Sequence, residues 1–147
     1  MSIQAVQAHL YPELIQVWEA SVRASHDFLS EAQIQHLRVL LLNTYFDQVN
    51  LQVWQDKCQQ CLGFVGVAAD QIEMLFVHPS AQGMGIGAAL VQHARQHLGA
   101  SKVDVNEHNP KALAFYQHLG GVINGRSATD GQGWPFPLLH LHWPEQD

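Results

Sequence analysis

The chain has 147 residues, 47% of them hydrophobic, which predicts one globular domain over residues 1–147 with a core of its own. Its 7 Lys and Arg against 13 Asp and Glu give a formal net charge of -6, which argues against nucleic-acid binding through a basic surface. No apolar run approaches the roughly 20 residues of a membrane span, and no basic and apolar leader begins the chain. We therefore expect a cytoplasmic protein that does not insert into membranes.

The first third of the chain predicts a strand followed by two helices. Residues Ile3 to Val6 read as a short strand, and Pro12 opens a helical pattern. Ser30 and Gln33 have the spacing of a capping box at the start of the second helix. Apolar residues recur at helical intervals in both helices: Leu14, Ile15, Trp18 and Val22 in the first, and Ile34, Leu37, Leu41 and Tyr45 in the second. Each helix is therefore expected to bury one face.

The apolar period then changes to two, which is typical of strands. Residues 49–53 alternate apolar and polar side chains, residues 55–60 form a turn, and residues 62–69 read as a partner strand. The apolar run over residues 72–77 reads as a buried central strand. This part of the sequence therefore predicts an antiparallel hairpin or meander.

The second half of the chain predicts two more helices among strands. The elements are a helix from about Gly85 to a stop at Gly99, a strand over residues 102–106, a helix ending at Gly120, and strands over residues 122–127 and 138–143. Asn109 caps the second of these helices, with Pro110 at its first position. Trp134, Phe136 and Trp143 lie near the last strands, where they could form a dimer contact or cover the core.

Cysteine and histidine patterns do not predict a metal site. Cys58 and Cys61 form a C-x-x-C, but no second cysteine pair exists and the segment lies at an expected turn, so we interpret them as reduced thiols. Two histidine pairs each share a face of a predicted element: His93 with His97, and His140 with His142. Neither pair has a third ligand at a recognisable spacing, and we interpret these histidines as solvated.

The most informative segment runs from the strand over residues 72–77 through a glycine-rich turn into a helix. Gly83, Gly85 and Gly87 leave consecutive backbone N–H groups unshielded at the start of that helix. The positive end of the helix dipole favours an anion at the same place. The segment therefore predicts a phosphate-binding turn.

Two motifs together resemble the GNAT N-acetyltransferase superfamily. Gln82, Gly85 and Gly87 have the spacing of its acetyl-CoA pyrophosphate loop, and residues 103–121 have its strand, asparagine, proline-led helix and Phe-Tyr pair. The predicted element order is also similar to the family's, and residues 21–29 are similar to small bacterial YjaB-like members. The resemblance implies an α/β (α+β) fold in which helices cover both faces of a mixed sheet of about seven strands.

The resemblance also implies where acetyl-CoA binds. In the family, two central parallel strands splay apart, and their unpaired backbone groups bind the pantetheine arm; here these are the strands over residues 72–77 and 102–106. The residues assigned to the cofactor in this way are Leu75, Phe76, Val77, Gln82, Gly83, Met84, Gly85, Ile86, Gly87, Asn109 and Tyr116. For Asn109, a helix cap and a cofactor contact are compatible roles, and both stay open.

Catalytic roles follow from the same resemblance. Tyr116 matches the tyrosine that protonates the leaving CoA thiolate; a phenol with a pKa of about 10 stays protonated at neutral pH beside a thiol of about 8.5. The alternative is that Tyr116 packs beside Phe115. Glu73 matches a position where some members keep a catalytic glutamate, and it is the first candidate for the base unless strand alternation directs it away. His78 and His26 are further candidates, and His26 lies in the region that shapes the acceptor pocket of the family.

The implied function is transfer of acetyl from acetyl-CoA to an amine by direct attack in a ternary complex. The acceptor is either a small-molecule primary amine or a protein lysine or N-terminus, and the protein is a monomer or a homodimer that binds no nucleic acid or metal. A non-catalytic acyl-CoA sensor on the same fold is the alternative. Gly83, Gly85 and Ala88, followed by Asp104, also satisfy a dinucleotide fingerprint, but residues 78–82 separate the strand from the turn and argue against NAD binding.

Overall fold

The structure is a computed structural model, and it describes residues 2–25, 29–131 and 133–144. The strands are β1 (Ser2–Ala5), β2 (Asn50–Gln55), β3 (Cys61–Ala68), β4 (Gln71–Val77), β5 (Lys102–Asn106), β6 (Val122–Ser127) and β7 (Leu138–His142). The helices are α1 (Tyr11–Ser25), α2 (Glu31–Asn43), α3 (Ile86–His97) and α4 (Pro110–His118), with short 3-10 helices η1 (Ala8–Leu10), η2 (Tyr45–Gln48) and η3 (Pro79–Ala81). The order of strands and α-helices is the predicted one.

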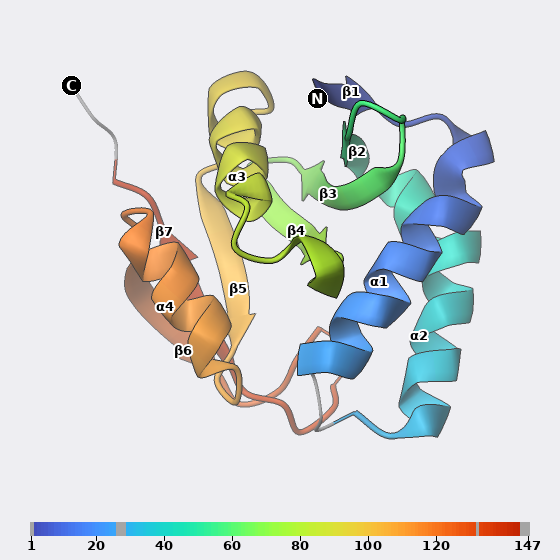
Figure 1. The fold of residues 1–147 in the computed structure, drawn as a ribbon. Coiled ribbons are helices and arrows are strands. Elements are labelled where there is room, and N and C mark those ends of the chain that lie inside the picture. The colour runs from blue at the N-terminus through green and yellow to red at the C-terminus, as the bar shows by residue number, and fades with distance from the viewer. Residues whose placement is uncertain (1, 26–28, 132, 145–147) are drawn as a thin grey trace.

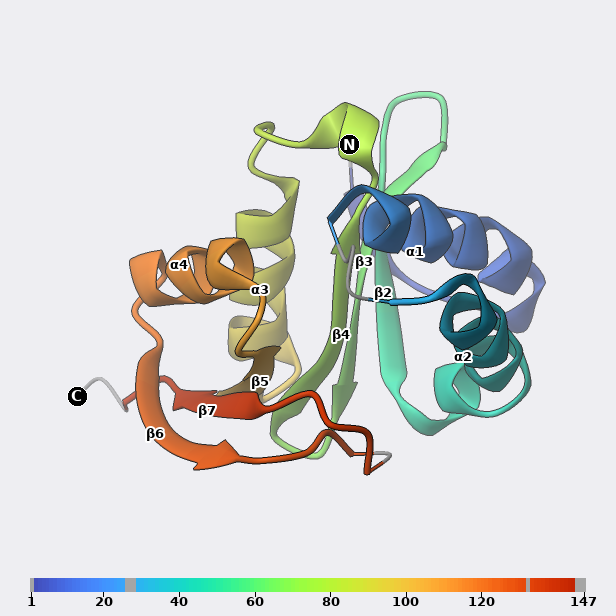
Figure 2. The same ribbon diagram turned by 90° about the horizontal axis from the view of Figure 1, so that it is seen from below.

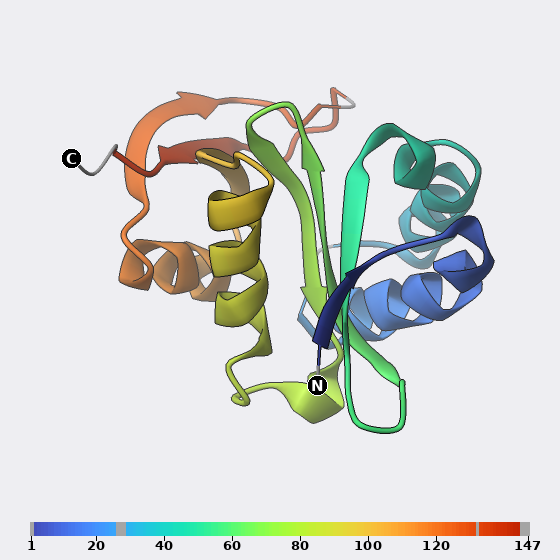
Figure 3. The ribbon, with the colours of Figure 1, turned by 90° about the horizontal axis from the view of Figure 1, so that it is seen from above.

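The strands of the described residues form one sheet in the order β1-β2-β3-β4-β5-β7-β6. Neighbouring strands are antiparallel except β4 and β5, which are parallel. Helices α1 and α2 cover one face of the sheet, and α3 and α4 cover the other (Figures 2 and 3). None of the helices in the described part of the chain combines the length and apolarity that a bilayer span requires.

Two hydrophobic cores lie on the two faces of the sheet. One joins α3 and α4 to the sheet and contains Val65 of β3, and the other joins α1 and α2 to it and contains Phe64. Phe64 and Val65 are both fully buried, because successive side chains of a strand point to opposite faces and β3 is covered on both. This explains why the sequence of β3 is a nearly continuous apolar run rather than an alternating one.

A β-bulge at Glu73 interrupts the pairing of β3 with β4. Gly66 pairs with Met74 and Val67 pairs with Ile72, so Glu73 is the extra residue on β4. The bulge reverses the alternation of side chains: Ile72 packs in the core beneath α3 and α4, whereas Met74, two residues later, packs in the core beneath α1 and α2. The bulge therefore determines on which face of the sheet each later side chain of β4 lies.

Strands β4 and β5 are paired at one end and open at the other. Within the described residues, the pairs are Gln71 with Lys102 and Ile72 with Val103, and the strands diverge beyond them (Figure 1). The rest of β4 therefore has no strand partner on its β5 side among the described residues. This is the splayed pair that the sequence analysis expected.

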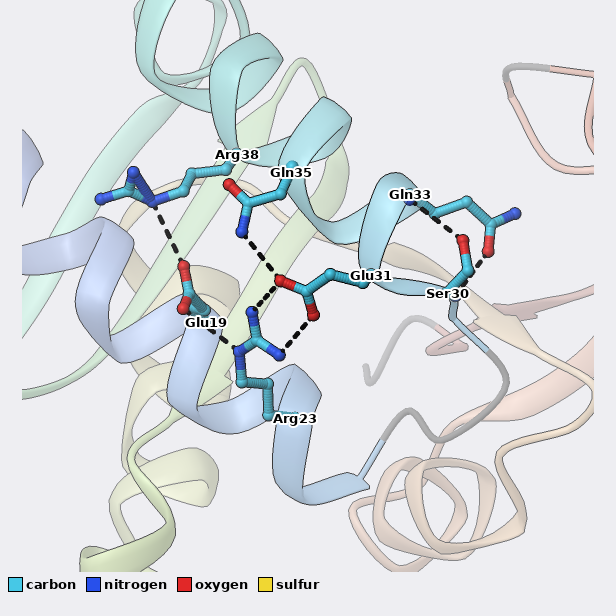
Figure 4. Close-up of polar contacts among 7 residues, drawn as sticks. All are labelled: Glu19, Arg23, Ser30, Glu31, Gln33, Gln35 and Arg38. Atoms are coloured by element: carbon cyan, nitrogen blue, oxygen red, sulfur yellow. Dashed lines mark hydrogen bonds and ion pairs between the residues drawn. The ribbon is translucent and has the colours of Figure 1, made fainter.

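Ion pairs fasten α1 to α2 on either side of the turn between them (Figure 4). The guanidinium of Arg23 donates to both carboxylate oxygens of Glu31, at 2.8 and 2.9 Å, and to Glu19 at 3.1 Å. The predicted capping box at Ser30 is present, with the Ser30 hydroxyl accepting from the Gln33 backbone N–H at 3.1 Å. These contacts fix the relative position of the two helices at the end that faces the open strand pair.

Several sequence-based details differ from the structure. Helix α2 ends at Asn43, so Tyr45 lies in η2 rather than in the helix. Trp143 is buried, and its indole N–H donates to the Leu119 carbonyl at 3.0 Å, so of the two roles considered for it the structure favours covering the core. Trp134 instead lies against His36 of α2, with ring centroids 6.0 Å apart.

Candidate cofactor and acceptor site

The glycine-rich turn connects the end of β4 to the start of α3. Gly83 and Gly85 have φ angles of 81° and 80°, which side-chain-bearing residues rarely adopt, and a Cβ on either would meet no atom within 4 Å. The side-chain amide of Gln82 donates to the Val77 carbonyl at 3.3 Å and so ties the turn to β4. Met84 points outward and is 61% exposed. The turn therefore offers backbone groups in open space at a helix start, as a phosphate site requires.

Gly87 serves a different purpose from the other two glycines. It lies within α3, and a Cβ added to it would be 3.1 Å from Cζ of Phe115 in α4. The absence of a side chain lets α3 and the Phe115 ring approach closely. Gly87 is therefore required for helix packing, a role that the glycine spacing alone does not reveal.

A groove of about 860 Å³ follows the turn and continues between β4 and α4. Its lining from β4, the turn and the start of α3 includes Leu75, Val77, Gln82, Gly83, Gly85, Ile86, Gly87 and Ala88. Helix α4 contributes Lys111, Ala112, Phe115, Tyr116 and His118, and Asn109 precedes it. Open glycine backbone at one end, a lysine on the wall and the unpaired side of β4 suit an extended, phosphorylated ligand with an amide-containing arm.

A second cavity of about 220 Å³ lies between the diverging strands β4 and β5. Its lining comprises residues 72–76 of β4, residues 103–106 of β5, and Ser21, Asn109, Ala112 and Tyr116. Both hollows share Ser21, Leu75, Asn109, Ala112 and Tyr116. A ligand in the groove and a second ligand in the cavity would therefore meet at these residues.

Tyr116 lies at this junction and is buried, with 7% of its surface exposed. Burial raises the pKa of its phenol well above the ordinary value of 10.0. The hydroxyl therefore stays protonated at neutral pH and can donate a hydrogen bond. Tyr116 also packs against Phe115, with ring centroids 5.0 Å apart, so the packing role and the site position coexist.

Asn109 also lies at the junction, where its side chain caps α4. Its Oδ1 accepts a hydrogen bond from the Ala112 backbone N–H at 3.1 Å, and Pro110 occupies the first helical position, as expected. The residue lines both hollows at the same time. The cap fixes the side chain at the junction, so the two roles left open by the sequence are compatible in the structure.

Glu73 lines the cavity between the strands from its position on the bulge. Its side chain is exposed, but partial desolvation raises its carboxyl pKa above 4.5, and the negative charge of Asp104 raises it further. A raised pKa brings a carboxylate closer to the range where it accepts a proton efficiently near neutral pH. Strand alternation alone does not predict this position, because Glu73 is the extra residue of the bulge.

The two histidine candidates have different outcomes. His78 lies outside the lining of both hollows, and its Nδ1 accepts from the Ser80 backbone N–H at 3.1 Å to cap η3. The structure therefore gives His78 a local role in the turn. His26 lies outside the described residues.

Two lining residues were not identified as site residues from the sequence. Ser21 is 9% exposed and occupies a position on the core-facing side of α1, where a polar residue is unusual. Asp104 lies between the buried residues Val103 and Val105, so alternation places it on the opposite face of β5. A polar residue at a core-facing helical position, and a carboxylate on a central strand, are the signals that could have found them.

The cysteines and the histidine pairs form no metal site in the structure. Among residues 2–25, 29–131 and 133–144, no group of three or more His, Cys, Asp or Glu side chains is placed to hold a metal ion. Cys58 is exposed and Cys61 is buried, and both are free thiols. The prediction that His140 is simply solvated is wrong, because its ring contacts Asp104 and Ser127.

Comparisons with known proteins agree with this arrangement. The model of the family described as Acetyltransferase (GNAT) domain matches residues 48–120. The chain is 36% identical over 132 residues to the peptidyl-lysine N-acetyltransferase YjaB of Salmonella typhimurium strain LT2, covering 90% of each protein. The solution structure of apo-form YjaB from Escherichia coli matches with a TM-score of 0.87 at 34% identity, over 97% of this chain and 96% of that chain.

A more distant structure shares the fold. The PaiA N-acetyltransferase from Thermoplasma acidophilum, solved in complex with coenzyme A, has a TM-score of 0.71 at 17% identity. The match covers 97% of this chain and 100% of that chain. At this level of identity the likeness concerns the fold alone.

Proposed function

The chain belongs to the GNAT acetyltransferase superfamily and is an acetyl-CoA-dependent N-acetyltransferase, and from this premise we propose that it acetylates lysine side chains of peptides or proteins. The single observation that carries the proposal is that the groove and the cavity meet at Tyr116. The groove is long and is bordered by the glycine-rich turn, whereas the cavity is small and is bordered by the carboxylates of Glu73 and Asp104. Relatives at 36% identity are named peptidyl-lysine N-acetyltransferase, which supports a lysine rather than a small free amine as acceptor.

In this proposal the groove holds acetyl-CoA and the cavity between β4 and β5 holds the acceptor amine. Acetyl-CoA, when bound, supplies an acetyl thioester. The turn from Gln82 to Gly87 would bind the pyrophosphate through its backbone N–H groups, and the unpaired side of β4 at Leu75 to Val77 would bind the pantetheine amides. Met84 would contribute its backbone, because its side chain points outward.

Glu73 and Tyr116 are the proposed proton-transfer residues. Glu73 accepts the proton that the acceptor ammonium must lose, directly or through one water, and the freed amine attacks the thioester carbonyl carbon. As the carbon–nitrogen bond forms and the carbon–sulfur bond breaks, Tyr116 donates its phenolic proton to the departing thiolate. The raised pKa of Glu73 supports its role, because it makes the carboxylate a better proton acceptor than an ordinary one. The raised pKa of Tyr116 keeps its hydroxyl protonated, so that it can hydrogen-bond to the sulfur as negative charge develops there.

The charge of the acceptor cavity supports a cationic acceptor. Glu73 and Asp104 line it, and no Lys or Arg is found among the described residues of that lining. A lysine side chain has an unbranched apolar stem with a terminal ammonium, which matches a narrow cavity that has apolar walls from β4 and β5 and carboxylates beside them.

The proposal is tested by incubating the purified protein with acetyl-CoA and two matched peptides, one with a lysine and one with norleucine at the same position, both with blocked N-termini. We expect mass spectrometry to show one acetyl group added to the lysine peptide and none to the norleucine peptide. Transfer to small primary amines but not to the peptide would overturn the lysine assignment. Calorimetric binding of acetyl-CoA, with NAD as control, but no transfer to any amine would favour the sensor alternative.

A further inference from the structure

Three side chains on three neighbouring strands form a hydrogen-bonded chain that ends at the acceptor cavity. Asp104 of β5 lies directly opposite His140 of β7, and its Oδ1 is 2.5 Å from Nδ1 of the imidazole. On the other side of the ring, Nε2 is 2.7 Å from the Ser127 hydroxyl of β6. The second carboxylate oxygen of Asp104 accepts from the Gln71 side-chain amide at 3.0 Å. Both oxygens of Asp104 are therefore held in place.

The chemistry of these partners fixes the proton on the imidazole. An ionised carboxylate only accepts hydrogen bonds, so Nδ1 of His140 carries the proton that it donates to Asp104. In the neutral ring Nε2 then has a free lone pair, and the Ser127 hydroxyl can donate to it. A hydroxyl can also accept a hydrogen bond, so the contacts of His140 are satisfied whether the ring is neutral or protonated, and in both cases they hold the Asp104 carboxylate in one orientation.

Cations near Asp104 are engaged elsewhere. Lys102, two residues before it on β5, forms an ion pair with Asp70 at 3.3 Å, and Arg126 of β6 forms one with Glu107 at 2.6 Å. The nearest charge described in the cavity is that of Glu73, whose carboxyl pKa the charge of Asp104 raises. The side chain of Asp104 remains 31% exposed, so its charge is accessible from the cavity.

We propose that Asp104 is a specificity-determining residue that holds the ammonium group of the acceptor in the cavity, and that His140 and Gln71 are positioning residues that aim its carboxylate. This inference rests on the proposed function, because it takes the cavity between β4 and β5 to be the acceptor site. It separates two carboxylates by role: Asp104 attracts and orients the cation, whereas Glu73 removes its proton. A carboxylate fixed by two hydrogen bonds loses little side-chain entropy on binding a cation.

The experiment is a nuclear magnetic resonance titration of the protein, saturated with CoA, with n-butylammonium, which reproduces the end of a lysine side chain. The wild-type protein should bind n-butylammonium more tightly than neutral n-butanol, a comparison that needs no substitution. Asp104→Asn should weaken n-butylammonium binding about five- to tenfold and leave n-butanol binding unchanged. Asp47→Asn, which removes the same charge from an exposed residue of η2 outside both hollows, is the matched control and should bind as the wild type does.

The positioning role of His140 has its own readout. His140→Asn keeps a donor near the place of Nδ1 and should retain most of the n-butylammonium affinity, whereas His140→Leu should lose it as Asp104→Asn does. In turnover, both Asp104→Asn and His140→Leu should raise the KM for the amine and leave the KM for acetyl-CoA unchanged, a split that a general loss of stability would not produce.

Two results would overturn the inference: equal binding of n-butylammonium and n-butanol by the wild-type protein, or unchanged n-butylammonium affinity in folded Asp104→Asn. Because the titration requires no turnover, it is independent of the lysine assay. If lysine peptides are not acetylated but n-butylammonium binding depends on Asp104, the proposed acceptor is wrong and the cation site stands. If lysine peptides are acetylated and n-butylammonium binding does not depend on Asp104, the proposed acceptor stands and the cation site at Asp104 is wrong.

Discussion

Gly87 of α3 lies so close to Phe115 of α4 that a Cβ on the glycine would be 3.1 Å from Cζ of the ring. Both residues line the groove proposed for acetyl-CoA. The helix start that presents backbone groups to the groove and the helix that carries Tyr116 are therefore packed directly against each other. The contact therefore lies in the wall of the groove.

Gly87→Ala should displace the Phe115 ring and narrow the groove. The overpacking cost of about 1–3 kcal/mol is partly offset by the helix propensity of alanine, which gains up to about 1 kcal/mol over glycine, so the protein should still fold. Calorimetry should show weaker acetyl-CoA binding. In a Phe115→Leu background the same substitution should have little effect, and equal losses in both backgrounds would show that the contact is not the cause.

Tyr116→Phe should lower kcat by about 100-fold or more, because the thiolate leaves without a proton donor. The acetyl-CoA dissociation constant should stay within about twofold, since the ring and its packing are kept. Tyr45→Phe makes the same chemical change in η2, outside both hollows, and should leave kcat unchanged. Steady-state kinetics and calorimetry provide both numbers, and a wild-type kcat in Tyr116→Phe would remove this residue from the mechanism.

Glu73→Gln should remove the acid limb of the pH profile of kcat/KM. The carboxyl pKa of Glu73 is raised above 4.5, so the wild-type rate should fall as the pH drops through that raised value and the base becomes protonated. The glutamine variant should be slower by about 100-fold at neutral pH and should lack this limb. Glu107→Gln, outside both hollows, should keep the wild-type profile.

The same substitution should not destabilise the fold at neutral pH. A carboxyl whose pKa is raised in the folded state favours the protonated form, so its contribution to stability is present at low pH and is lost as the pH rises through that pKa. Removing the charge should therefore leave the melting temperature unchanged or raise it. A marked drop in melting temperature would mean that the kinetic loss in Glu73→Gln reflects unfolding.

The order of elements and the glycine-rich turn were predictable because their signals are local. A change of period from 3.6 to 2 separates helices from strands, and positive φ at Gly83 and Gly85 follows from a turn that other residues would strain. The cap at Asn109 is equally local, because the accepting and donating groups are three residues apart. In each case the residues that decide the structure are close in sequence.

Features that depend on strand partners were not predictable in the same way. The bulge at Glu73 exists because of how β4 pairs with β3, and one sequence does not fix that register. The contact of His140 with Asp104 requires β7 to lie beside β5, thirty-six residues apart in sequence. His140 was therefore interpreted as solvated, and Asp104 was considered for a dinucleotide fingerprint, although the two residues are paired.

The two cysteines should differ sharply in reactivity. Burial raises the pKa of the Cys61 thiol to about 12, and hydrogen bonding to the Glu13 carboxylate, 3.1 Å away, adds to this. The thiolate is the reactive form, so iodoacetamide at pH 8 should modify exposed Cys58 and spare Cys61 in the folded protein. Mass spectrometry should show one label before unfolding and two after it; two labels in the folded protein would contradict the burial of Cys61.

The bridge from α1 to α2 should contribute to stability in a pH-dependent way. Hydrogen bonds from Arg23, and then from Gln35, lower the carboxyl pKa of Glu31 from 4.5 to about 2 (Figure 4). A group whose pKa is lowered in the folded state stabilises the fold above its unfolded pKa, and this contribution is lost as the pH falls through the folded value. The stabilisation from the bridge should therefore be complete above about pH 5 and should disappear toward pH 2.

Arg23→Met should accordingly lower the melting temperature slightly at neutral pH, because the bridge is exposed to solvent and screened. The difference from the wild type should shrink between about pH 4.5 and pH 2, and it should also shrink in high salt at neutral pH. Arg38→Met is the matched control, since Arg38 makes a single contact at 3.2 Å with Glu19 rather than a bidentate one, and its effect should be smaller. A melting difference for Arg23→Met that is independent of both pH and salt would show that the methylene groups of Arg23, and not its pairing with Glu31, hold the two helices together.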